Sequence, residues 1–324
     1  MPVRKSRYIQ HPPNAIQIEL TEGCNLSCSF CGINGIRESK GGPYNFLDIN
    51  DAAKIALGIK AVGWNPRIEF AMHGEPTMNP NYLAIVAAFR AVLPRTHLMM
   101  TSNGIGFLKR PGINRRINEL MDVGLNVLLL DDYQGIMIVK KIREGYDGPY
   151  PVYEYPDNRW GNPHRRRKFD VHDIVVVQDI ASATSGNHSK LNNHAGSASP
   201  KNYNADGKRC AKPFREMSIR WNGAVSICCN DWRGEYKCGN VCMEPIDDVW
   251  QSPAFVVARK KLYHGERDFG PCNGCDALSY RVGFLPDYKG LDKLPRANKR
   301  DKEIISEALR GKSFSIPILR PWEK

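Results

Sequence analysis

Short apolar runs alternate with amphipathic stretches along the first half of the chain. Six runs have the composition typical of β-strands, at residues 15–20, 67–72, 97–101, 126–130, 151–155 and 174–178. Most are separated by apolar residues at helical spacing, in segments 48–62, 81–92, 113–123 and 133–143. This alternation predicts a parallel sheet. Six strands are too few for a closed eight-stranded barrel, so we expect a partial (β/α)6 barrel with functional groups at the carboxyl ends of its strands.

Changes in composition divide the chain. Residues 144–169 are rich in Pro, Gly, Tyr and Arg and are interpreted as an insertion, and residues 182–208 form a long polar connection. Seven of the ten cysteines lie beyond residue 208, and a basic tail with a helical pattern at 302–309 follows them. We therefore expect four parts, which are an N-terminal segment (1–14), a barrel domain (15–208), a small cysteine-rich domain (209–279) and a tail (280–324).

The composition limits the class of protein. No stretch approaches the roughly 18 unbroken apolar residues of a membrane helix, and the basic N-terminus has no apolar signal region, so we expect a cytoplasmic protein without membrane contact. Disulfides are unfavourable there, and clustered cysteines instead indicate metal or redox chemistry. The net charge of +12 is a weak indication of a nucleic-acid partner.

Three cysteines follow the first expected strand, and their spacing is informative. Cys24, Cys28 and Cys31 form a C-x3-C-x2-C pattern, with Phe30 before the last cysteine. Three thiolates on one loop can bind three irons of a 4Fe-4S cluster and leave the fourth iron open for catalysis. A zinc knuckle or buried thiols are the alternatives, but a closed zinc site requires a fourth ligand nearby.

This loop resembles the radical S-adenosylmethionine (SAM) superfamily in its spacing, its aromatic residue and the strand before it. The resemblance implies that the open iron binds SAM, and that an electron from a flavodoxin- or ferredoxin-like donor cleaves SAM to a 5'-deoxyadenosyl radical, which abstracts a substrate hydrogen. It also aligns residues 71–76 with the family's Gly-Gly-Glu motif, with His73 in place of the first Gly. Gly74 and Glu75 would then contact the methionine amine of SAM.

Two further segments are expected to contact SAM by the same resemblance. Residues 101–104 are similar to the turn that contacts the ribose, with Ser102 and Asn103 as partners of its hydroxyls, and the backbone near Val176 and Gln178 would meet the adenine. Simple turns are the alternative for Gly74-Glu75 and for Ser102-Asn103. A plain electron carrier would need none of these residues, so they favour an enzyme.

The C-terminal cysteines form a second group. Cys210 and Cys228 fit the pattern C-x9-15-G-x4-C through Gly223, and Cys272 and Cys275 form C-x2-C. The pattern resembles the SPASM and twitch auxiliary domains of radical SAM enzymes, which implies a small α+β domain with a second 4Fe-4S cluster on these four cysteines. A full SPASM domain would continue with more cysteines, and none follows Cys275, so we expect one auxiliary cluster.

Three cysteines are left over from these patterns. Cys229 competes with Cys228 for the ligand role, and the glycine spacing favours Cys228. Cys238 and Cys242 are interpreted as small core residues. Zinc remains an alternative to the auxiliary cluster.

A cluster without an open iron suits electron transfer, so a net oxidation such as dehydrogenation is the favoured reaction. A small molecule, a peptide and a nucleotide all stay open as substrates, with peptide maturation or nucleotide modification as alternative reactions. An electron carrier or a zinc-binding module is the non-enzyme alternative.

The sequence also offers candidate bases and a candidate phosphate-binding segment. Asp131, Tyr133 and His194 are candidate bases, although Asp131-Asp132 also fits a helix cap. Residues 193–196 (NHAG) resemble an Asn-Arg-Ala-Gly element of related enzymes, with His194 in place of Arg, and a plain loop is the alternative. The basic segment 164–168 fits phosphate binding or an exposed charge run.

Overall fold

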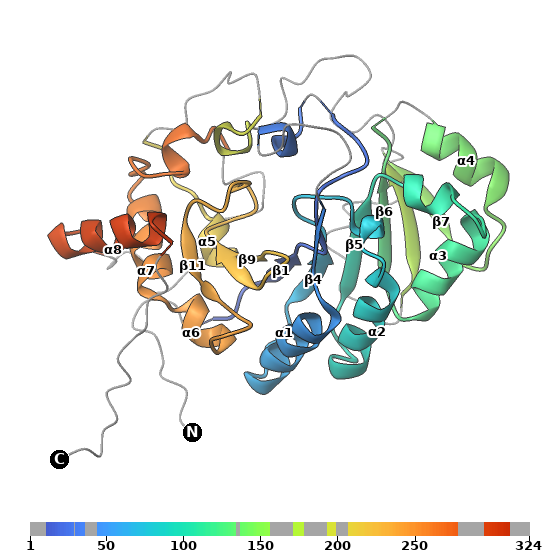
Figure 1. Cartoon of the computed structure of the whole chain (residues 1–324), viewed down its shortest axis with the longest axis horizontal. Coiled ribbons are helices and arrows are strands. Elements are labelled where there is room, and N and C mark those ends of the chain that lie inside the picture. The colour runs from blue at the N-terminus through green and yellow to red at the C-terminus, as the bar shows by residue number, and fades with distance from the viewer. Residues whose placement is uncertain are drawn as a thin grey trace.

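The computed structural model describes residues 11–28, 30–35, 44–133, 137–155, 171–177, 193–198, 207–277 and 295–311. Its centre is a curved sheet of nine strands in the order β11-β10-β9-β1-β4-β5-β6-β8-β7 (Figure 1). A separate antiparallel pair, β2 (Thr21–Glu22) and β3 (Asn45–Phe46), lies next to the loop that follows β2. The partial α/β barrel expected from the sequence is confirmed.

All six expected strands are present and their pairings are parallel. They are β1 (Ala15–Ile18), β4 (Arg67–Phe70), β5 (Leu98–Ser102), β6 (Val127–Asp131), β7 (Val152–Tyr155) and β8 (Asp173–Val177). The order of the last two strands is inverted relative to the sequence, because β8 pairs with β6 and β7 forms the edge. The segment 144–169 therefore contains an edge strand, and its residues from 156 to 169 lie outside the described part of the chain.

Four helices cover the outer face of these strands (Figure 1). They are α1 (Ile49–Ala61), α2 (Tyr82–Val92), α3 (Ile113–Asp122) and α4 (Met137–Gly145), close to the four expected positions. Helix α1 begins after Asp48, whose carboxylate accepts a hydrogen bond of 2.7 Å from the backbone N–H of Asn50. Within the described residues, short 3-10 helices lie in the loops at Gly32–Gly35, Pro76–Met78, Ile105–Leu108, His194–Gly196 and Cys272–Gly274.

The alternation of side chains along the strands gives the sheet two different faces. Ile16, Ile68 and Leu128 belong to the large core beneath the outer helices. On the inner face Met99 and Val127 belong to a small separate apolar cluster. Polar groups occupy the inner face of β1 and β4, where Gln17 donates a 2.9 Å hydrogen bond to Glu69. The inner face is thus apolar at one end and polar at the end nearer the C-terminal strands.

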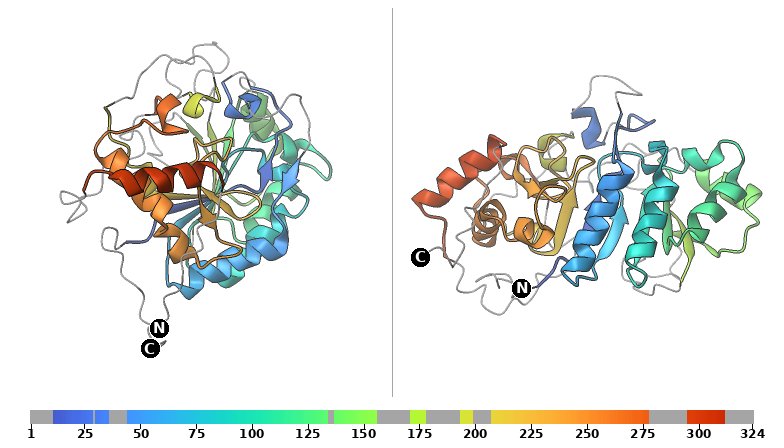
Figure 2. Two further views of the ribbon diagram at one scale, coloured as in Figure 1. Left: turned by 60° about the vertical axis from the view of Figure 1, so that its left-hand side comes forward. Right: turned by 60° about the horizontal axis from the view of Figure 1, so that its bottom comes forward.

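The cysteine-rich part of the chain continues the same sheet. Its elements are α5 (Lys212–Arg215), β9 (Glu216–Ile219), β10 (Ala224–Ser226), β11 (Lys237–Asn240), α6 (Ile246–Trp250), α7 (Pro253–Tyr263) and α8 (Lys299–Leu309). Strand β9 pairs in parallel with β1, and β10 and β11 follow as an antiparallel meander. The expected helix in the tail is confirmed as α8, which packs beside α7 at the end of the molecule away from α3 and α4 (Figure 2). The exact domain boundaries stay a prediction.

None of the helices described here has the length and apolar character needed to cross a lipid bilayer.

Candidate active site

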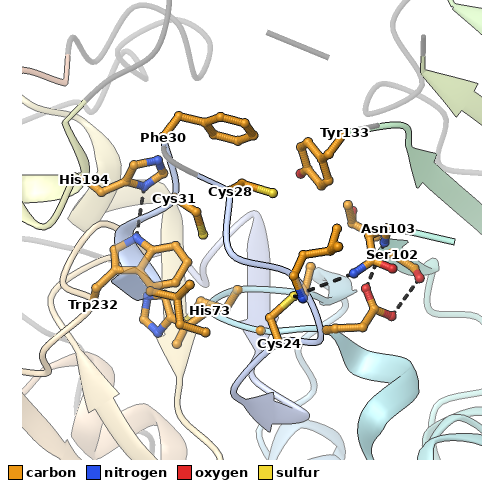
Figure 3. Close-up of a pocket in the computed structure, with 17 residues that line it drawn as sticks. Cys24, Cys28, Phe30, Cys31, His73, Ser102, Asn103, Tyr133, His194 and Trp232 are labelled. Carbon is orange, nitrogen blue, oxygen red and sulfur yellow. Dashed lines mark hydrogen bonds between the residues drawn. The ribbon is translucent and has the colours of Figure 1, made fainter. Parts of the chain in front are cut away.

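A cavity of about 200 Å³ opens at the carboxyl ends of the parallel strands, and the first three cysteines line it. Cys24, Cys28 and Cys31 come from the loop after β2. In Figure 3 their side chains lie between Tyr133 on one wall and His194 with Trp232 on the other. The sequence predicted this loop, and the structure places it where barrel enzymes carry their reacting groups.

The surroundings of these thiols suit an iron-sulfur cluster. The backbone N–H of Leu26 and the amide Nδ2 of Asn103 lie 3.4 Å and 3.6 Å from the sulfur of Cys24. Such N–H···S contacts stabilise a coordinated thiolate and tune its cluster. Burial raises the pKa of the Cys28 thiol, so a metal is needed to keep it deprotonated at neutral pH. Within the described residues, no three His, Cys, Asp or Glu side chains are arranged to hold a single metal ion.

Gly74 packs directly against the backbone beside the cysteine loop. A Cβ atom at this position would lie 2.1 Å from the carbonyl oxygen of Thr21 and 2.4 Å from that of Gly23. The next residue donates its backbone N–H to the Gly23 oxygen at 3.0 Å. Only glycine allows this close approach, so the end of β4 and the start of the cysteine loop fix each other's position.

Glu75 is 2% exposed and its carboxylate is bound by the protein itself. Oε1 accepts hydrogen bonds from the hydroxyls of Thr77 (2.6 Å) and Ser102 (2.7 Å), and Oε2 accepts one from the backbone N–H of Asn103 (2.8 Å). Burial raises the pKa of Glu75, and these hydrogen bonds oppose the rise. The carboxylate therefore ties the ends of β4 and β5 together at the cavity.

The residues expected to contact SAM are only partly brought together. Gly74, Glu75, Ser102 and Asn103 all line the cavity. Val176 instead packs in the core beneath the outer helices, and Gln178 lies outside the described residues. Contacts of all six with SAM stay a prediction.

His73, which replaces a glycine of the expected motif, is fully buried. Its Nδ1 lies 2.9 Å from Oε1 of Glu19, and its Nε2 lies 2.8 Å from the carbonyl oxygen of Cys229. A carbonyl oxygen only accepts, so Nε2 donates. His73 thus connects the ends of β1 and β4 with the loop after β10.

Trp232 comes from the cysteine-rich part of the chain and closes one side of the cavity. Its indole ring packs on Gly32, where a Cβ atom would lie 2.7 Å from the ring, and its centroid is 4.5 Å from that of His73. The indole N–H donates a 2.9 Å hydrogen bond to Nδ1 of His194. No motif in the sequence pointed to Trp232, because its partners are distant along the chain.

Asp131 and Tyr133 belong to the opposite wall of the cavity. Asp131 is 4% exposed, its Oδ2 accepts a 3.1 Å hydrogen bond from the Tyr133 hydroxyl, and its Oδ1 has no partner among the described residues. Burial raises the pKa of Asp131 to about 7. The helix-cap interpretation applies to Asp132 instead, which accepts a 2.8 Å hydrogen bond from the backbone of Ile138 in α4.

The four cysteines predicted to hold the second cluster come together in the fold. Burial and then the neighbouring thiols of Cys210 and Cys275 raise the pKa of Cys272 well above its ordinary value. Burial raises the pKa of Cys228 in the same way; Cys229 raises it further, Lys212 lowers it, and Cys272 and Cys275 follow as weaker charged neighbours. These mutual effects indicate that the four thiols lie near one another, an arrangement that suits a four-thiolate cluster.

The leftover cysteines have other surroundings. The ammonium of Lys212 donates a 3.2 Å hydrogen bond to the sulfur of Cys229, and the same ammonium contacts Glu216 at 3.1 Å. Burial raises the pKa of Cys229, and Lys212 partly offsets this rise. Cys238 is buried in the main core and Cys242 packs against it. The choice of Cys228 over Cys229 as the ligand, made from the glycine spacing, stays a prediction.

Two family models match the chain. A model of the radical SAM superfamily matches residues 18–131, and a model of the SPASM iron-sulfur cluster-binding domain matches residues 210–276. The chain belongs to the radical SAM superfamily. As a radical SAM protein with this domain, it uses SAM, a SAM-binding 4Fe-4S cluster and an auxiliary 4Fe-4S cluster.

Similar proteins include enzymes with different reactions. An S-adenosyl-L-methionine-dependent 2-deoxy-scyllo-inosamine dehydrogenase from Niallia circulans is 21% identical over 274 residues, which are 84% of this chain and 96% of the relative. A GTP 3',8-cyclase from Mycobacterium ulcerans is 31% identical over 100 residues, which are 29% of this chain and 26% of the relative. The solved structure of BtrN in complex with AdoMet and 2-DOIA superposes on this chain with a TM-score of 0.63 at 21% sequence identity. The match covers 86% of this chain and 98% of the BtrN chain, so the two proteins share a fold.

Proposed function

We propose that this radical SAM protein is a dehydrogenase that oxidises a hydroxyl group of a small molecule to a ketone. The observation that carries the proposal is the cavity, which the cysteine loop and Trp232 of the SPASM domain line together. Similarity to an inosamine dehydrogenase along nearly its whole length supports the same reaction and makes 2-deoxy-scyllo-inosamine the first substrate to test. A low-potential electron donor and a cytoplasmic location belong to this proposal.

In this proposal Cys24, Cys28 and Cys31 hold the first cluster. Four other cysteines hold the second cluster, namely Cys210, Cys228, Cys272 and Cys275. When bound, the first cluster would supply the electron for reductive cleavage of SAM and so the acceptor of a substrate hydrogen atom, and the auxiliary cluster would supply the acceptor for the electron that the oxidation leaves. The chain itself must bind the substrate and accept that proton.

Asp131 and Tyr133 are the groups that we assign to proton removal. The Tyr133 hydroxyl lines the cavity and donates its hydrogen to Asp131, so its oxygen can accept a proton from a substrate hydroxyl while its own proton moves to the carboxylate. Burial raises the pKa of Tyr133 well above its ordinary value, which suits a relay that never becomes a phenolate. With a pKa of about 7, the Asp131 carboxylate can both accept and release a proton near neutral pH.

The pH dependence of oxidation tests this proton route. Asp131 accepts a proton only when ionised, so the rate should rise with pH through about 7. The Tyr133 hydrogen bond lowers the pKa of Asp131, so a Tyr133→Phe variant should be slower by roughly 10²-fold or more and should reach half its maximum at a higher pH. The measurement is the rate of ketone formation from pH 5.5 to 9, and an unchanged midpoint in the variant argues against Asp131 as the acceptor.

Substrate deuterated at the carbon that carries the hydroxyl tests the function itself. We expect one deuterium to appear in 5'-deoxyadenosine for each ketone formed from 2-deoxy-scyllo-inosamine, because the same hydrogen leaves carbon and enters the adenosyl group. A Cys275→Ser variant should still cleave SAM but form no ketone. Ketone formation without deuterium transfer contradicts the proposal, and SAM cleavage without any ketone excludes this substrate.

A further inference from the structure

Two buried cations lie beside the cysteines assigned to the auxiliary cluster. The first is Lys212, which begins α5 and has a side chain only 11% exposed. Its ammonium donates a 3.2 Å hydrogen bond to the sulfur of Cys229 and pairs with Glu216 at 3.1 Å. Burial raises the pKa of Cys210, and a hydrogen bond from the backbone N–H of Lys212 opposes this rise. Lys212 therefore contacts two of the cysteine-bearing segments at once.

The second cation is Arg267, which is 4% exposed. Its guanidinium donates to four carbonyl oxygens, those of Lys208 (2.9 Å), Arg209 (3.3 Å), Cys275 (3.5 Å) and Ala277 (3.1 Å). In the described part of the chain all of its hydrogen bonds go to carbonyl oxygens, and no carboxylate pairs with it. Arg267 thus joins the segment that leads into Cys210 to the one that contains Cys275.

A buried cation without a carboxylate partner needs another source of negative charge. Four thiolates outweigh the positive charge of an oxidised 4Fe-4S core, so a cluster with four cysteine ligands is an anion. Reduction adds one electron, breaks no bond and makes this anion more negative. Nearby cations and N–H···S hydrogen bonds therefore stabilise the reduced cluster more than the oxidised one, and they raise its reduction potential.

The two cations act on three of the four assigned ligands. Burial raises the pKa of Cys210, Cys228 and Cys272. Lys212 opposes this rise at Cys210 and Cys228, and Arg267 opposes it at Cys210 and Cys272. Both cations thus favour negative charge on the sulfur atoms that the cluster would use.

We propose that Lys212 and Arg267 raise the reduction potential of the auxiliary cluster and so make it a better electron acceptor. The inference rests on the proposed function, which assigns the ligands, and deepens it by naming groups that set the driving force for oxidation. It holds whether Cys228 or Cys229 is the ligand, because Lys212 acts on both. Neither cation lines the cavity, so both are positioning residues that act through the cluster.

A redox titration of the reconstituted holoenzyme at one pH, followed by electron paramagnetic resonance without SAM or substrate, tests the potential. The signal that is lost in Cys275→Ser belongs to the auxiliary cluster. At a fixed solution potential, Lys212→Met should lower the ratio of reduced to oxidised auxiliary cluster by about 10-fold, or about 59 mV, the smallest effect expected for a neighbouring unit charge. Lys212→Arg keeps the charge and should stay near the wild-type ratio.

Two further variants separate charge from loss of an ion pair. Lys260→Met is the matched control, because Lys260 pairs with Asp301 at the same 3.1 Å and its side chain is also 11% exposed. This variant should keep the wild-type potential. Glu216→Gln removes the negative partner of Lys212 and should raise the potential, opposite to Lys212→Met. A lower potential in Glu216→Gln overturns the inference, because the broken ion pair and not the charge would then cause both shifts.

Arg267 has its own pair of variants. Arg267→Gln should lower the ratio of reduced to oxidised auxiliary cluster, and Arg267→Lys, which keeps the charge, should lower it less. Arg90→Gln is the control, because Arg90 of α2 also donates to carbonyl oxygens, at 2.7 Å to Gly124 and 2.9 Å to Thr96. Wild-type potentials in both Lys212→Met and Arg267→Gln overturn the inference, and equal shifts in the Lys260 and Arg90 controls do the same.

Iron content separates an effect on potential from an effect on assembly. Each variant except Cys275→Ser should keep about eight irons per chain. A Lys212→Met protein that holds only about four irons shows that Lys212 is required for the cluster to form, and overturns its assignment here. No substrate enters the titration. If wild-type enzyme forms no ketone but the potentials shift as expected, the dehydrogenase assignment fails and this inference stands.

Discussion

Replacing Cys228 with serine is expected to remove the auxiliary cluster, whereas replacing its neighbour Cys229 is not. The charged neighbours of Cys228 are Cys229 and Lys212 and then the thiols of Cys272 and Cys275, whereas the sulfur of Cys229 accepts a hydrogen bond from Lys212. Loss of one ligand from a four-thiolate site exposes an iron and destabilises the cluster. The Cys228→Ser protein should lose about four of about eight irons per chain and should form no ketone.

The comparison is made by counting iron and sulfide in anaerobically reconstituted proteins. Both variants should still cleave SAM, because the first cluster is bound by a separate loop. Cys242→Ser, at a half-buried cysteine packed on the core, serves as the control and should keep all the iron. A Cys229→Ser protein that loses four irons while Cys228→Ser keeps them would reverse the ligand assignment.

Replacing Gly74 with alanine is expected to abolish SAM cleavage. The added Cβ would lie 2.1 Å from the Thr21 carbonyl oxygen and 2.4 Å from that of Gly23, and backbone atoms cannot yield as a flexible side chain does. The cysteine loop must therefore move away from the end of β4. Overpacking of this kind costs about 1–3 kcal/mol of unfolding free energy, and a displacement near 1 Å at a reacting site can cost about 10²-fold in rate.

Gly58→Ala is the matched control for this substitution. Gly58 lies within α1, and a Cβ there meets Ile246 only at 3.9 Å, an ordinary contact. Alanine should raise the free energy of unfolding by about 0.5–1 kcal/mol in a helix interior and leave SAM cleavage unchanged. Thermal unfolding and 5'-deoxyadenosine formation are measured for both variants. If the Gly74→Ala protein cleaves SAM at the wild-type rate, Gly74 does not pack against the Thr21 and Gly23 carbonyl oxygens as closely as described.

The barrel could be predicted from the sequence because its signals are local. Periodicity located the six parallel strands, and the cysteine spacing located the loop that lines the cavity. Pairing between distant segments leaves no such signal. Neither the edge position of β7 nor the parallel pairing of β9 with β1 can be inferred from residue patterns, because both depend on which distant strand offers a free edge.

The candidate site also combines residues that local motifs predict with contacts that depend on distant segments. Gly74, Glu75, Ser102 and Asn103 were found from motifs, but the sequence did not show that Glu75 binds Ser102 and Asn103. Trp232 was missed because its function depends on contacts with Gly32, His73 and His194, which come from three other loops. Motifs identify the residues that chemistry requires, and tertiary contacts decide how they are held.

Anaerobic reconstitution with iron and sulfide, followed by reduction and addition of SAM, tests the central claim most directly. The measurement is iron per chain together with 5'-deoxyadenosine formed before any substrate is added. We expect about eight irons, the content of two 4Fe-4S clusters, and slow but clear formation of 5'-deoxyadenosine. About four irons or bound zinc, with no SAM cleavage in any reduced preparation, would contradict a radical enzyme with an auxiliary cluster.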